Sequence, residues 1–125
     1  MRERSDREQA ELFLTPEHVA AEPSALPAWR AIAPITTPAQ RQRRTAAMQV
    51  PLEPISLESI EAPTLVVHGT ADRIVPIAHA RSNAAAIARA DMVELAEVGH
   101  VSPLQAPARL AEVVSAFLTS RASQP

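Results

Sequence analysis

The chain lacks cysteine altogether and has only two glycines among its 125 residues. Without cysteine there can be no disulfide, no thiolate nucleophile and no cysteine-ligated metal, so packing alone must hold the fold together. Aromatic residues make up only 2% of the sequence, with one tryptophan and no tyrosine. Redox chemistry through cysteine is therefore excluded, and few rings are available for stacking on nucleic-acid bases.

A strong charge of one sign and long apolar runs are also missing. The net charge is -2 at pH 7, which gives no general attraction to nucleic acid. The short basic cluster of Arg41, Arg43 and Arg44 is interpreted as a solvated helix face. No apolar run approaches the roughly 20 residues that a membrane-spanning helix needs, and the charged N-terminus has no signal-peptide core. We therefore expect a cytoplasmic chain that binds neither nucleic acid nor membrane.

From about residue 60 onward, the hydrophobic pattern predicts a β-α-β-α unit. The range 64–68 is β-branched and apolar on both faces, which is typical of a strand buried in a parallel sheet. A helix that starts at Pro76 and a second strand over 92–96 follow. The last predicted helix, over 107–120, carries apolar residues at helical spacing on one side.

Both glycines stand where the predicted strands end. Gly69 closes the first strand shortly before Asp72, and Gly99 directly precedes His100. A right-handed crossover makes the two strands parallel, so the loops that follow them open at the same edge of the sheet. We therefore expect Asp72 and His100 to lie close together.

Residues 1–55 are predicted to form a helical segment interrupted by prolines. Thr15-Pro16 and Thr37-Pro38 are each typical of an N-cap followed by proline at the first helical position. Between these two starts, the range 21–36 is expected to break into turns around Trp29 because it contains Pro23, Pro27 and Pro34. We expect no core within that stretch.

A carboxylate beside a histidine suits acyl-transfer chemistry. The histidine moves the proton of a nucleophile, while a buried carboxylate fixes the ring's tautomer and stabilises the imidazolium. Taken singly, Asp72 is better explained as a turn residue after a strand and His100 as a loop histidine; only the two together favour a catalytic role. A metal set of His68, Asp72, His79 and His100 matches no standard zinc spacing. We therefore expect no metal and no cofactor.

Residues 60–118 resemble the last two β-α units of the α/β-hydrolase superfamily. The resemblance rests on the run PTLVVHGTAD that ends at Asp72, on Val75-Pro76 after it, and on Gly99-His100. It implies an α/β fold in which Asp72 is the triad acid and His100 the triad base. Residues 1–50 resemble the helical cap that many family members insert before these strands, so we divide the chain into a cap-like segment, 1–55, and a core part, 56–125.

The family's nucleophile is absent from this sequence. Two distant glycines cannot supply the G-x-S-x-G turn that exposes a catalytic serine, nor its G-x-D-x-G counterpart. Ser102 shares a loop with His100 and is interpreted as an N-cap before Pro103 or an exposed residue, not a nucleophile. We therefore expect the C-terminal part of a hydrolase fold, incomplete as a stand-alone fold and inactive alone.

Two functions remain open at this point. In the first, the chain is completed by an N-terminal half and hydrolyses a small-molecule ester or a related acyl bond. In the second, it is a non-catalytic relic or interaction module, which pairs with a partner or with itself through the exposed edge of strand 64–68.

Overall fold

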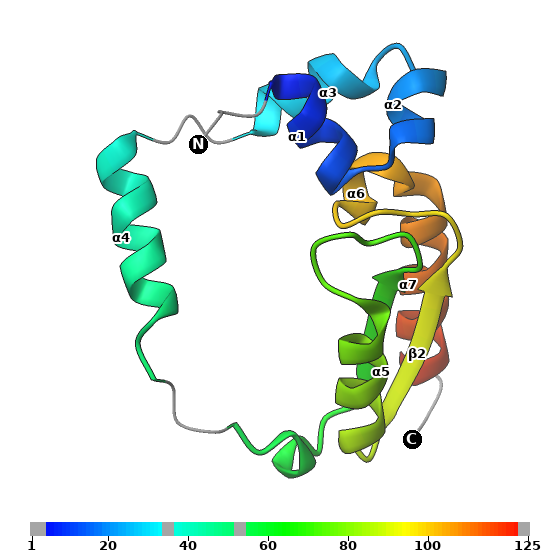
Figure 1. Cartoon of the computed structure of the whole chain (residues 1–125). Helices are drawn as coiled ribbons and strands as arrows, with labels where there is room; N and C mark the ends of the chain where they lie inside the picture. Colours follow the sequence, from blue (N-terminus) through cyan, green and yellow to red (C-terminus); the bar gives the residue numbers. More distant parts are fainter. Residues whose placement is uncertain (1–4, 34–36, 52–54, 123–125) are drawn as a thin grey trace.

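The computed structural model describes residues 5–33, 37–51 and 55–122. Four helices come first: α1 (Asp6–Phe13), α2 (Pro16–Ala21), α3 (Ala25–Ile32) and α4 (Pro38–Met48). A 3-10 turn, η1 (Leu57–Ser59), precedes the alternating part: β1 (Thr64–Gly69), α5 (Ile77–Ala86), β2 (Ala90–Leu95), α6 (Ser102–Gln105) and α7 (Pro107–Ala122). Figure 1 shows α1, α2 and α3 gathered above the strands, with α4 standing apart from them.

The two strands form a parallel pair, as the β-α-β-α pattern predicts. Thr64 lies opposite Ala90 and Gly69 lies opposite Leu95. In Figure 1, α5 lies in front of the pair and α7 behind it. The second strand begins and ends earlier than the predicted range 92–96, because the ladder with β1 starts at Ala90 and the chain turns after Leu95.

The strand pair leaves much apolar surface uncovered. Residues 64–68 of β1 are only half-buried, and β1 has a partner on one edge alone within the ranges that the structure describes. On α7, the predicted apolar side is open as well: Val114 is 37% exposed and Leu118 60% exposed. These exposures agree with the expectation of an incomplete fold, because two strands are too few to bury both faces of a sheet.

The expectation of turns without a core around Trp29 is wrong. Residues 25–32 form α3, and Trp29 belongs to a buried cluster with Ala10, Leu14, Val19 and Ala25. Pro27 is the third residue of α3, where the backbone has no intrahelical partner for an N–H group and proline is tolerated. Pro34 lies outside the described residues.

The two predicted N-caps are confirmed. The Thr15 side chain accepts a hydrogen bond from the backbone N–H of His18 at the start of α2, and Thr37 does the same for Gln40 in α4. The helix α4 buries none of its residues, and its arginines are exposed. Among the described helices, none has the length and apolar character needed to cross a membrane.

Candidate active site

The loop after β1 folds around the carboxylate of Asp72. One carboxylate oxygen, Oδ1, accepts hydrogen bonds from the backbone N–H groups of Ile74, at 2.8 Å, and Val75, at 2.9 Å. The Asp72 side chain is only 2% exposed. A short polar side chain that bonds the backbone two and three residues onward fixes such a turn. The carboxylate is therefore held in place by its own loop before any other group contacts it.

His100, on the loop after β2, contacts the other oxygen of this carboxylate. Its ring nitrogen Nδ1 lies 2.9 Å from Asp72 Oδ2, and its side chain is 35% exposed. The two residues come from the carboxyl ends of neighbouring parallel strands, which open at one edge of the sheet. Because Nδ1 is engaged, Nε2 is the ring nitrogen that remains for proton transfer.

His68 also lies against the carboxylate, a contact that the sequence pattern does not predict. Its Nε2 lies 2.9 Å from the carbonyl oxygen of Val75 and 3.3 Å from Asp72 Oδ2. His68 therefore closes the same turn from the side of β1. By contrast, His79 lies exposed on α5. Within the described part of the chain, no three side chains of ligand type are placed to hold a metal.

The two glycines let three backbone segments approach one another. A Cβ atom on Gly69 would overlap the carbonyl oxygen of Val98, and one on Gly99 would overlap that of Leu14. The loop that carries His100 is thus pressed between the end of β1 and the end of α1. The N–H of Val101 adds a hydrogen bond of 3.0 Å to the carbonyl of Phe13. Residues without a side chain are required at both close approaches.

An aromatic pair from the N-terminal helices lies against the candidate base. Phe13 stacks on Trp29 with ring centroids 4.8 Å apart, and its ring meets that of His100 edge-on at 5.8 Å. Trp29 is buried in the helical core, whereas Phe13 is the ring that reaches the histidine.

Ser102 is placed differently from either expectation. It is the first residue of α6 and is half-buried, while Val101 holds the N-cap position. The interpretation of Ser102 as an N-cap or an exposed residue is therefore wrong. The helix starts one residue early because Pro103 fits its first turn as the second residue.

The surroundings of Asp72 keep it ionised. Burial disfavours the charged carboxylate and on its own would raise its pKa. Hydrogen bonds from the Val75 N–H, the His100 ring and the Ile74 N–H favour the charged form and together hold the pKa of Asp72 below its ordinary value. The carboxylate is therefore available as a negative partner for an imidazolium.

This lowered pKa predicts a loss of stability in acid. The unfolded chain binds a proton at Asp72 more readily than the folded chain does, so the contribution to stability is complete above the ordinary pKa of about 3.9. It is lost as the pH falls through the lower pKa of the folded state. Urea unfolding at pH 7 and near pH 3, at fixed protein concentration, measures it. Asp72→Asn should show a smaller change, and an equal change in both chains would contradict the prediction.

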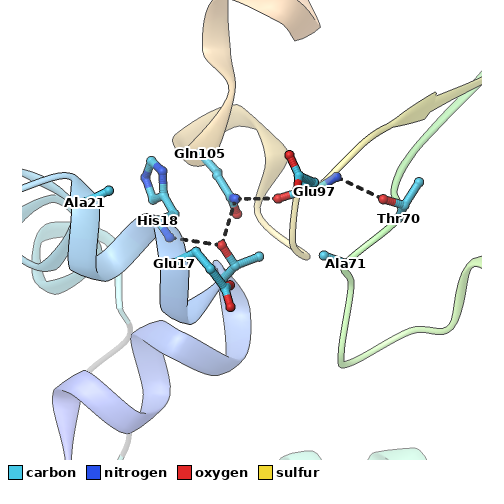
Figure 2. A pocket seen from close by; sticks show the side chains of 8 residues that line it. Glu17, His18, Ala21, Thr70, Ala71, Glu97 and Gln105 are labelled. Carbon is cyan, nitrogen blue, oxygen red and sulfur yellow. Dashed lines mark hydrogen bonds between the residues drawn. The ribbon is translucent and has the colours of Figure 1, made fainter.

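A pocket of about 460 Å³ lies between α2 and the loops after β1 and β2 (Figure 2). Neither Asp72 nor His100 lines it. Its walls come from α2 and its N-cap on one side, and from the loops after β1 and β2 and the end of α6 on the other. They include Thr15, Glu17, His18, Thr70, Glu97 and Gln105. The pocket therefore lies where the N-terminal helices meet the β-α-β-α part of the chain.

The chain belongs to the alpha/beta hydrolase family, whose model matches residues 2–113. This confirms the resemblance noted for residues 60–118 and extends it over the N-terminal helices. No curated protein matches the chain.

Several solved structures share the fold, two of them esterases. A thermophilic esterase from Thermogutta terrifontis superposes with a TM-score of 0.75 and 20% identity, over 92% of this chain and 43% of its own. The esterase RhEst1 from Rhodococcus gives 0.73 and 20%, over 92% and 40%. Est816, described as an N-acyl homoserine lactone degrading enzyme, gives 0.70 and 26%, over 89% and 45%. The chain thus spans less than half the length of these structures.

Proposed function

We propose that this chain supplies the acid and base of a hydrolase that cleaves an ester or related acyl bond. The observation that carries the proposal is the 2.9 Å contact between a buried carboxylate, Asp72, and a partly open histidine, His100, at the carboxyl end of two parallel strands. Family membership and the esterase and lactone-degrading neighbours support it.

The proposed chemistry assigns one role to each side chain. His100 Nε2 takes the proton of a nucleophilic hydroxyl as the hydroxyl attacks the acyl carbon, and later returns it to the leaving group. Asp72 holds the ring by Nδ1 and stabilises the imidazolium that forms. Neither residue can form the acyl intermediate, so the nucleophile and the oxyanion-binding amides belong to another segment.

The uncovered surfaces suggest where that segment sits. Within the described residues β1 pairs on one edge alone, so its other edge can accept a further strand, and the exposed Val114 and Leu118 on α7 offer apolar contacts. A neighbouring strand there would end at the same sheet edge as Asp72 and His100. A nucleophile at the end of such a strand would come within reach of His100.

We expect the chain alone to have no esterase activity and to self-associate. Without a nucleophile and oxyanion hole the acid-base pair has nothing to activate, and the open strand edge invites pairing. Turnover of a chromogenic short-chain ester and elution in size-exclusion chromatography measure both properties. Adding the N-terminal part of a related esterase, up to its cap, should give a one-to-one complex and restore turnover.

Other outcomes would favour a different function. A chain that stays monomeric and unfolds cooperatively would show that it completes its own core. Turnover by the chain alone that vanishes in His100→Ala would call for a nucleophile within these residues. A tight complex without turnover, formed through β1, would favour the interaction module that the exposed strand edge also suits.

A further inference from the structure

The side-chain amide of Gln105 joins two parts of the chain that are 90 positions apart. Its Oε1 accepts a hydrogen bond of 2.9 Å from the N–H of Gly99. Its Nε2 donates to the carbonyl oxygen of Glu97, at 3.0 Å, and to Thr15 Oγ1, at 3.2 Å. Figure 2 shows the amide between the start of α2 and the loop after β2. Donor and acceptor of one side chain are thus both in use.

The loop that Gln105 holds has an unfavourable backbone conformation. Glu97 has a φ of 61°, in the left-handed region that residues with a side chain adopt infrequently. Both of its backbone groups are held from outside: the N–H donates to Thr70 Oγ1, at 3.0 Å, and the carbonyl accepts from Gln105. A strained residue persists where its surroundings fix it on both sides. His100 follows three residues later, directly after Gly99.

Thr15 anchors the other end of this connection. It is 4% exposed, and its hydroxyl oxygen also accepts the N–H of His18 as the N-cap of α2. The orientation of Thr15 is therefore set by the helical core. Through its hydrogen bonds, Gln105 links Thr15 to the backbone of Glu97 and Gly99. A displacement of α2 would reach the loop of His100 through this amide, beside the direct contacts that Phe13 and Leu14 make with the same loop.

We infer that Gln105 is a positioning residue, which couples the helical segment α1–α3 to the loop that carries His100. The inference deepens the proposed function and rests on it for the role of His100. The amide does not touch the reacting atoms. It holds the backbone of Glu97 and Gly99 just before His100, so that a displacement of the helices alters the position of the His100 ring.

Hydrogen exchange in the 125-residue chain tests the coupling without any activity measurement. We expect Gln105→Leu to lower the protection of the Gly99 amide about tenfold relative to the amide of Val93 in β2. Gln105→Glu keeps an acceptor for Gly99 but cannot donate to the Glu97 carbonyl while ionised, and it should also lower protection. If Gly99 and Val93 lose protection together, the role is merely structural and the inference is overturned.

Two matched variants of Thr15 test the coupling if Gln105→Leu does not fold. Thr15→Ser keeps the hydroxyl oxygen, whereas Thr15→Val has the same shape and lacks it. We expect Thr15→Val to lower the relative protection of Gly99 and Thr15→Ser to leave it near the native value. Equal protection of Gly99 in both variants would overturn the coupling.

A completed enzyme adds a second readout. Gln105→Leu should lower kcat about tenfold while KM stays unchanged, because a misplaced base affects the chemical step rather than binding. A native assembly without turnover would contradict the proposed function but leave the exchange results intact. Normal kcat in Gln105→Leu together with lowered protection of Gly99 would show that the loop's position does not govern the base, and would overturn the positioning role.

Discussion

Replacing His100 by alanine should lower kcat by on the order of 10⁴ to 10⁶ in an assembly that supplies the nucleophile. The ring moves the proton in both halves of the reaction, and the neighbouring imidazole of His68 has its Nε2 bound to the Val75 carbonyl. Since His100 Nδ1 is bound to Asp72 at 2.9 Å, the alanine substitution removes Nε2, the ring nitrogen that is not bound to the acid. Single-turnover kinetics with a chromogenic ester measures the effect on the acylation step.

His79→Ala is the matched control for this prediction. His79 is an exposed histidine on α5, outside the contacts of Asp72 described above, so its removal should change kcat less than twofold, within the scatter expected of surface substitutions. If His79→Ala abolished turnover while His100→Ala retained it, the base would be wrongly assigned. The alignment of Gly99-His100 with the family motif would then fail as well.

The proximity of Asp72 and His100 follows from local sequence patterns and one topological rule. An apolar run ending at Gly69 and a second strand before Gly99 define two strand ends. The handedness of the crossover brings those ends to one edge of the sheet. The confirmed fold class depends on the same periodicity, because buried parallel strands and amphipathic helices differ in their repeat.

Other features depend on contacts that no short pattern encodes. Helix α3 forms although it contains Pro27, because its Trp29 joins a buried cluster with Leu14, the C-cap residue of α1. His68 closes the acid's turn through Val75, and Gln105 meets Thr15 from the far end of the chain. Tertiary packing decides such contacts, and it routinely outweighs local propensity. The available sequence signal for His68 was its place directly before Gly69, the last residue of β1.

The second large effect is expected on replacing the carboxylate of Asp72 by an amide. Asp72→Asn should lower kcat by on the order of 10⁴, as in other triads where the acid becomes an amide. The carboxylate here accepts from Ile74 and Val75 through Oδ1 and from His100 through Oδ2, with His68 Nε2 3.3 Å from that second oxygen. An amide has one acceptor oxygen, so it cannot serve both sides.

In Asp72→Asn we expect the side-chain oxygen to stay with the backbone N–H groups of Ile74 and Val75, because the turn before α5 fixes these two donors. The NH₂ group of the asparagine then faces His100 Nδ1 and requires that nitrogen to be unprotonated, which places the proton on Nε2 and removes the base. Asp72→Glu keeps the charge and shifts it, so it should retain more activity than Asp72→Asn. The imidazole ¹⁵N resonances of His100 report the tautomer directly. If they match in the native and Asp72→Asn assemblies, and kcat is unchanged, Asp72 does not set the state of the base.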